Sequence, residues 1–222
     1  MAEEYLTDEE QLEQVKRVVA ENWIWVAGGV LLGAALIFGY RYYDGYQNQR
    51  ALQAAARFGA LTDALEHNDK AKTLQLADGL IQEFPASPYA DQAQLVLARV
   101  YVDDGQLDKA VAPLTQVMEH SKDTELKHVA RLRLARVLTA EGKPDAALST
   151  LSGDAPGAFA ATYHEVRGDA FYAKHDLKSA ETEYKAALTG GMGAADTGLL
   201  ELKLADLASA APPPDTTNKA TP

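Results

Sequence analysis

The chain has 222 residues, of which 47% are hydrophobic and 24% charged, and its formal net charge is −11. These values exclude a chain that is disordered throughout, and the length suffices for one membrane span plus one domain with a core. The acidic balance argues against a nucleic-acid partner, which needs a basic surface. The absence of cysteine excludes disulfides, thiolate zinc sites and a cysteine nucleophile.

Residues 1–22 form the first predicted element, and they carry seven acidic residues against Lys16 and Arg17. Thr7 and Glu10 have the spacing of a capping box, which satisfies free amide groups at a helix start. Apolar residues then recur at helical spacing, at Leu12, Val15, Val18 and Val19. We predict an acidic amphipathic helix, continuous with the next element, that is either a solvated cap or a docking element.

Residues 23–40 (WIWVAGGVLLGAALIFGY) contain no charged residue. As a helix they would span about 27 Å, close to the thickness of the hydrocarbon layer, and aromatic residues stand at both ends. A buried core helix would carry polar residues on some face. A cleaved signal peptide would need a basic start and a cleavage site of small residues. The sequence therefore predicts an uncleaved transmembrane anchor in a lipid bilayer.

Four small residues lie along one face of this anchor, at Gly29, Gly33, Ala35 and Gly39. Such a stripe lets a partner helix approach closely, although small residues are also common in membrane helices without a packing role. Basic residues occur on both sides of the span, so the positive-inside rule does not decide the orientation.

Beyond the anchor the chain repeats itself. Leu95–Leu114 and Leu132–Leu151 are identical at nine of twenty positions, and Glu165–Tyr184 is a third copy. Each copy has a small residue, a large apolar residue three positions later, a turn, a second small residue and a closing apolar residue. The first two positions are Ala98 with Tyr101, Ala135 with Leu138, and Gly168 with Phe171, and the second small residues are Ala110, Ala147 and Ala180. This order at a period of about 34 residues predicts tetratricopeptide-type helical hairpins.

Two further parts complete the predicted array. A degenerate first copy comprises the helices Gln49–His67 and Lys70–Phe84, followed by prolines that end the second helix. A last amphipathic helix over Asp196–Ala208 would cap the apolar end of the array. We therefore predict an all-α protein in which residues 41–209 form a tetratricopeptide-like solenoid and residues 210–222 a disordered, proline-rich tail.

A search for catalytic chemistry finds none. The five histidines are scattered, and His164-Glu165 lacks the second histidine of a zinc motif because Gly168 stands in its place. The glycine run at residues 190–193 lacks the Lys-Ser/Thr of a phosphate loop, and no serine lies in a nucleophile elbow. We expect no catalytic site, no cofactor and no metal, and hence a protein that is not an enzyme.

The remaining candidate is a binding groove on the concave side of the array. The residue after each first small position should point into this groove, and other candidates lie one helical turn away on the same faces. The six residues are Arg99, Arg133, Arg136, Glu165, Asp169 and Tyr172. The arginines can receive an acidic or C-terminal segment of an extended chain, or they can form ordinary surface salt bridges.

The chain resembles a known family along nearly its whole length. The segments that carry the resemblance are QVKRVVAEN (14–22), the end of the anchor at GYRYY (39–43), and LRLARV (132–137). It is similar to the YfgM-like ancillary subunits of the bacterial SecYEG translocon. The resemblance implies an inner-membrane protein with a cytoplasmic N-terminus and a periplasmic repeat domain. The proline-containing tail departs from the family pattern.

The resemblance also implies partners. These are the SecYEG translocon, a membrane-anchored periplasmic prolyl isomerase-like chaperone, and newly exported polypeptides. The leading hypothesis is therefore a protein-interaction module at the exit of the export channel. The alternatives are an anchored scaffold or assembly factor of another envelope complex, and an enzyme with a site hidden in the groove.

Overall fold

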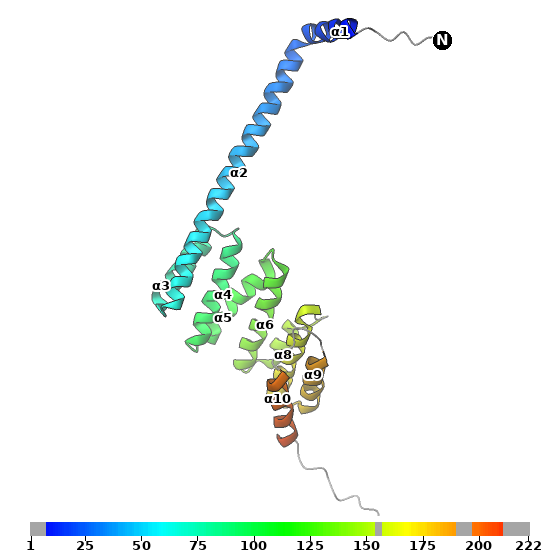
Figure 1. The fold of residues 1–222 in the computed structure, drawn as a ribbon. Coiled ribbons are helices and arrows are strands. Elements are labelled where there is room, and N and C mark those ends of the chain that lie inside the picture. Colours follow the sequence, from blue (N-terminus) through cyan, green and yellow to red (C-terminus); the bar gives the residue numbers. More distant parts are fainter. Residues whose placement is uncertain (1–7, 154–156, 190–196, 211–222) are drawn as a thin grey trace, which may run out of the picture. The chain divides into compact units, whose positions relative to one another are not determined.

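The computed structural model describes residues 8–153, 157–189 and 197–210 (Figure 1). The helices are α1 (Asp8–Glu21), α2 (Trp23–Glu66), α3 (Lys70–Glu83), α4 (Pro88–Asp103), α5 (Leu107–His120), α6 (Thr124–Ala140), α7 (Pro144–Thr150), η1 (Gly157–Phe159), α8 (Ala160–Ala173), α9 (Leu177–Thr189) and α10 (Thr197–Ala210). No strand occurs in these three ranges, which confirms the all-α prediction. The predictions for Thr7, for the glycine run at 190–193 and for the tail after Ala210 lie outside the described residues.

The chain divides into two compact units, residues 1–53 and 54–222. In the first unit α1 ends at Glu21 and α2 begins at Trp23, so the prediction of one continuous helix is wrong. The interruption lies at Asn22, a residue type whose short polar side chain competes for backbone hydrogen bonds and is unfavourable inside helices.

Helix α2 contains the predicted anchor. It does not end near Arg41 but continues as one 44-residue helix to Glu66, so the expected first repeat helix does not start separately at Gln49. A window of 18 residues within α2 has a mean hydropathy of 1.8 and no buried residue. By length and composition α2 can therefore cross a membrane.

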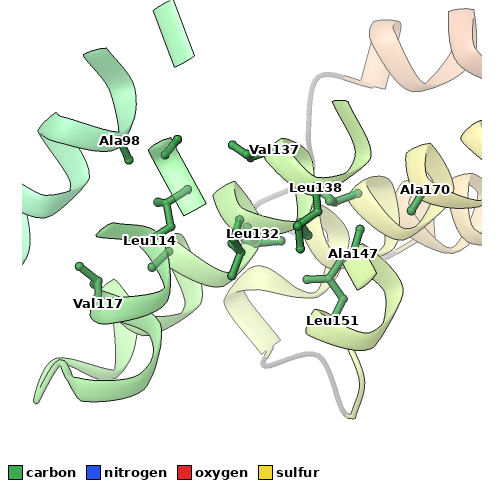
Figure 2. Close-up of a cluster of buried hydrophobic side chains, with 14 of the residues drawn as sticks. Ala98, Leu114, Val117, Leu132, Val137, Leu138, Ala147, Leu151 and Ala170 are labelled. Atoms are coloured by element: carbon green, nitrogen blue, oxygen red, sulfur yellow. The ribbon is translucent and has the colours of Figure 1, made fainter. Parts of the chain in front are cut away.

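The second unit consists of helical hairpins, α4 with α5, α6 with α7 and α8 with α9, preceded by the end of α2 with α3. The small positions of the repeat are buried, with exposed fractions of 1% for Ala98 and 0% for both Ala135 and Ala110. Leu114 and Leu151 close the same core at 1% and 0% exposure, and Figure 2 shows this cluster. The predicted small-against-large packing is thus present in the structure.

In the third copy the two helices pack against each other through a different pair of residues. Gly168 replaces the alanine of the other copies and Tyr184 replaces the closing leucine. A Cβ atom built on Gly168 would lie 2.4 Å from Cε1 of Tyr184, whereas real contacts of a Cβ atom are not that close. The glycine therefore provides the space that the larger tyrosine ring occupies.

Every hairpin turn uses the same backbone geometry. Gly105 and Gly142 have φ angles of 71° and 76°, the left-handed conformation that favours glycine. His175 at 61° and Asn68 at 55° adopt it in the other two hairpins. The residue after each left-handed position donates its amide to a carbonyl five residues earlier, at 2.8–3.0 Å for the acceptors Ala64, Tyr101, Leu138 and Phe171. All four turns are therefore Schellman motifs. The turn between α8 and α9 has the same geometry although His175 stands in place of glycine.

Helix α10 packs against α9 at the end of the array. Leu200 and Leu207 are buried, and they form a cluster with Ala180, Tyr184 and Ala187. Because α10 covers the apolar face that the third hairpin would otherwise expose, it fulfils the expectation of a capping helix.

We predict that Gly168→Ala destabilises the repeat domain by about 1–3 kcal/mol, the usual cost of overpacking a core. Tyr184 cannot swing away easily, because it is 2% exposed and its hydroxyl donates a hydrogen bond to Asp169. Urea unfolding of the full chain in detergent, followed by far-ultraviolet circular dichroism, measures the change. The control is Gly59→Ala, where the added Cβ meets no atom within 4 Å. That exposed helical position should gain up to about 1 kcal/mol, and equal effects at both positions would contradict the prediction.

Candidate functional site

A cavity of about 220 Å³ is lined by residues of α4, α5 and α6. Its floor is apolar and its other lining residues are three arginines. The floor residues are Ala98, Val102, Leu114 and Val137, and the arginines are Arg99, Arg133 and Arg136. Three of the floor residues, Ala98, Leu114 and Val137, also belong to the core cluster or its labelled surroundings in Figure 2. The cavity therefore borders the main hydrophobic core of the repeat array.

The repeat itself brings the arginines together. Arg99 and Arg136 follow the small residues of consecutive first helices, so stacking of the two hairpins aligns them, and Arg133 lies one turn before Arg136 on α6. The pKa of Arg133 is lowered from its usual value, first by burial of the guanidinium and then by the charges of Arg99 and Arg136. The lowered pKa reflects an environment in which positive charge is incompletely compensated.

The ion pairs that these arginines form are weak. Arg99 Nε lies 3.7 Å from a carboxylate oxygen of Asp103, and both side chains are more than half exposed. Arg136 lies at the same distance, 3.7 Å, from Glu165. The exposed Arg99 pair contributes little, since water screens it, and the long separation also weakens the pair of Arg136 with the 7% exposed Glu165. Glu141, the acidic residue that follows α6, pairs with Lys143 and not with an arginine of the cavity. The ordinary salt bridges that the sequence also allowed are therefore present, but they do not neutralise the charge of the three arginines.

The other three candidates face the capping helix instead of the cavity. Lys203 of α10 donates to Glu165 at 2.8 Å and to Asp169 at 2.7 Å. Tyr172 donates its hydroxyl hydrogen to Asp206 of α10 at 2.9 Å. Three of the six candidate groove residues therefore contact α10 and do not line the cavity.

The sequence analysis did not identify Lys203 and Asp206, because both lie outside the repeat pattern. One signal for Lys203 exists: it is the only basic residue of the leucine-rich helix α10. One of its two acceptors is well enclosed, since the Glu165 side chain is 7% exposed, and the other, Asp169, is 30% exposed. Tyr184 completes the cluster, and burial together with the nearby Asp169 carboxylate raises the pKa of its phenol. The hydroxyl therefore stays protonated and remains a hydrogen-bond donor to Asp169.

The candidate packing stripe in the anchor lies on α2. A Cβ atom built on Gly29, Gly33 or Gly39 would meet no other atom of the described chain within 4 Å, and Ala35 is exposed. The stripe thus has no packing role against the described part of this chain. Its pairing with a partner helix stays a prediction.

No group of three or more residues suited to holding a metal ion occurs among the described residues. His164, the start of the incomplete zinc motif, lies 2.7 Å from Glu183, and Glu183 also pairs with Arg167 at 3.0 Å. This histidine therefore takes part in a link between α8 and α9.

Comparison with known proteins identifies the family. The model of the tetratricopeptide repeat-like domain matches residues 16–209. An ancillary SecYEG translocon subunit of Escherichia coli (strain K12) is 32% identical over 203 residues, covering 91% of this chain and 98% of that protein. The chain belongs to the ancillary SecYEG translocon subunit family.

Two other relatives have the same name. The protein of Haemophilus influenzae is 28% identical and that of Neisseria gonorrhoeae 30% identical, covering 84% and 83% of this chain and 91% and 88% of their own lengths. The resemblance noted from the anchor and repeat segments is therefore confirmed along nearly the whole chain. Together with the apolar helix α2, membership of this family indicates a membrane-anchored protein.

We predict that Arg133→Gln raises the free energy of unfolding by about 0.2–0.5 kcal/mol at low salt, because it removes a like-charge neighbour of Arg136 on the same helix face. The gain should vanish at high salt, which screens the repulsion. Urea unfolding at two salt concentrations measures it. Arg57→Gln is the matched control, because Arg57 lies outside the cavity and pairs with Glu83 at 2.8 Å. A loss of stability for Arg133→Gln at low salt would show that its charge is already compensated.

Proposed function

We propose that this protein is a non-enzymatic interaction module that is anchored in the inner membrane beside the SecYEG translocon. The observation that carries the proposal is the 32% identity with an ancillary subunit of that translocon, which extends over 98% of the relative's length. Identity over such a length includes both the helix α2 and the repeat domain. The repeat array supports a binding role, because stacked helical hairpins present extended concave surfaces to other proteins.

In this proposal α2 crosses the bilayer, the N-terminus is cytoplasmic and the repeat domain is periplasmic. The domain binds newly translocated polypeptides and a membrane-anchored periplasmic prolyl isomerase-like chaperone, and so keeps the chaperone near the exit of the channel. Anchoring serves this role because confinement raises the local concentration of each partner, so that weak interfaces suffice. Exported chains must be released again, and weak binding is compatible with release.

Crosslinking in native membranes tests the location. We expect translocon subunits among the products, and we expect their yield to fall for the double variant Gly29→Leu, Gly33→Leu, because leucine prevents close approach of a partner helix. Ile24→Leu and Leu31→Ile, two conservative changes on the opposite, exposed face of α2, form the control. Consistent absence of translocon subunits, with another envelope complex among the products, would favour the alternative of an assembly factor for that complex.

Reporter fusions test the orientation. Alkaline phosphatase fused after Pro222 should be active, because it folds only outside the cytoplasm, whereas a green fluorescent protein exported in unfolded form at the same position should be dark. A fusion at the C-terminus leaves the whole of α2 and the repeat domain intact. The opposite pattern, an inactive phosphatase with a bright fluorescent protein, would place the repeat domain in the cytoplasm and contradict the proposed topology.

A further inference from the structure

The cavity between α4 and α6 combines aliphatic side chains with positively charged ones, and the two favour different groups of a ligand. Its floor consists of aliphatic side chains, which gain free energy when an apolar group displaces water from them. Its lining also includes three arginines, whose guanidinium groups favour a planar anion with two oxygens. A free inorganic anion would pair with the arginines but would leave the aliphatic floor in contact with water. The complementary ligand therefore carries a carboxylate beside an apolar group.

A protein segment meets this requirement when an acidic residue adjoins an aliphatic one. The position of the cavity agrees with such a ligand, because it lies where consecutive first helices of the array form the inner surface. The volume of about 220 Å³ accommodates a single aliphatic side chain and part of the adjoining backbone, and nothing much larger. The site is thus suited to a short segment of an extended chain.

The carboxylate that pairs with Arg136 has a second and closer partner. Glu165 lies 3.7 Å from Arg136 but 2.8 Å from Lys203, so its main partner is the lysine of α10. The same lysine holds Asp169 at 2.7 Å. Without Lys203, the 7% exposed carboxylate of Glu165 would need a new partner, and Arg136 is the nearest arginine to it. Arg136 would then be lost to an incoming ligand.

We propose that the cavity binds an extended peptide segment in which an acidic residue adjoins an apolar residue, and that Lys203 of α10 keeps Arg136 available by binding Glu165. The proposal rests on the proposed function, in which the domain receives segments of other proteins, and it specifies the chemistry of those segments. Lys203 acts here as a positioning residue, since it does not line the cavity.

The test uses the full chain in detergent and a fluorescein-labelled, C-terminally amidated peptide, Gly-Ser-Leu-Asp-Leu-Asp-Ser-Gly, with fluorescence anisotropy as the readout. We expect binding that weakens with salt, and about tenfold weaker binding when both aspartates become asparagine or when Arg133→Gln removes one guanidinium. Arg133→Lys should lie between these values, because lysine keeps the charge without the planar fork. Arg57→Gln, outside the cavity, should bind like the unmodified protein.

Competition and peptide controls identify the ligand. A peptide with serine in place of both leucines should bind several-fold more weakly, since the floor then stays in contact with water. Millimolar inorganic phosphate or glycerol phosphate should compete poorly for the same reason. Absence of binding, equal binding of the asparagine peptide, or displacement by glycerol phosphate at the peptide's own concentration would each overturn the proposal, the last in favour of a lipid headgroup.

A second pair of variants tests the role of Lys203. Lys203→Gln should weaken binding of the acidic peptide, and addition of Glu165→Gln should restore it, because the competing carboxylate is then absent. Circular dichroism of both variants verifies the helical fold. Full affinity of a folded Lys203→Gln protein, or no recovery in the folded double variant, would overturn the positioning role. These measurements need no translocon, so a failure here is distinguishable from a failure of the crosslinking experiment.

Discussion

The repeat array depends on close approach between the two helices of each hairpin. Ala98, Ala135 and Gly168 lie where a larger side chain would keep the helices apart, and the residues opposite them fill the space that remains. In the third copy a smaller residue on one helix faces a larger one on the other. The exchange indicates that the combined side-chain volume between the two helices matters more than either residue alone. Stacking of the hairpins, and with it the alignment of surface residues into a groove, follows from these contacts.

The sequence was sufficient for the hairpins because their pattern depends on local volumes and turns. The sequence was less informative about side chains whose partners lie far away along the chain. The position after the small residue gives Arg99 and Arg136, and the position one turn earlier on α6 gives Arg133; all three line the same cavity, since α4 and α6 are consecutive first helices. The same rule failed to show that Glu165, Asp169 and Tyr172 face α10, because their partners Lys203 and Asp206 lie more than thirty positions away in no repeated register. Likewise, the glycine rule for turns did not anticipate that His175 would adopt the left-handed conformation.

The arginine cluster follows from repetition of a charged position. In a stacked array, equal residues at equal positions come to lie above one another, so a charge that is harmless in one hairpin becomes a repulsive pair in two. Arg133 intensifies the effect, as its lowered pKa reflects. Such an arrangement is tolerated if an anionic ligand binds at the site or if the repulsion lowers stability only slightly. The exposure of the Arg99 and Arg136 side chains keeps the repulsion small, because water screens it.

Solenoids commonly change length by gaining or losing whole hairpins, and the double contact of Lys203 restricts this freedom. A new hairpin inserted after α9 would take the place of α10, and it would have to supply a cation that reaches both Glu165 and Asp169. The number of hairpins in this array is therefore tied to the identity of its last helix.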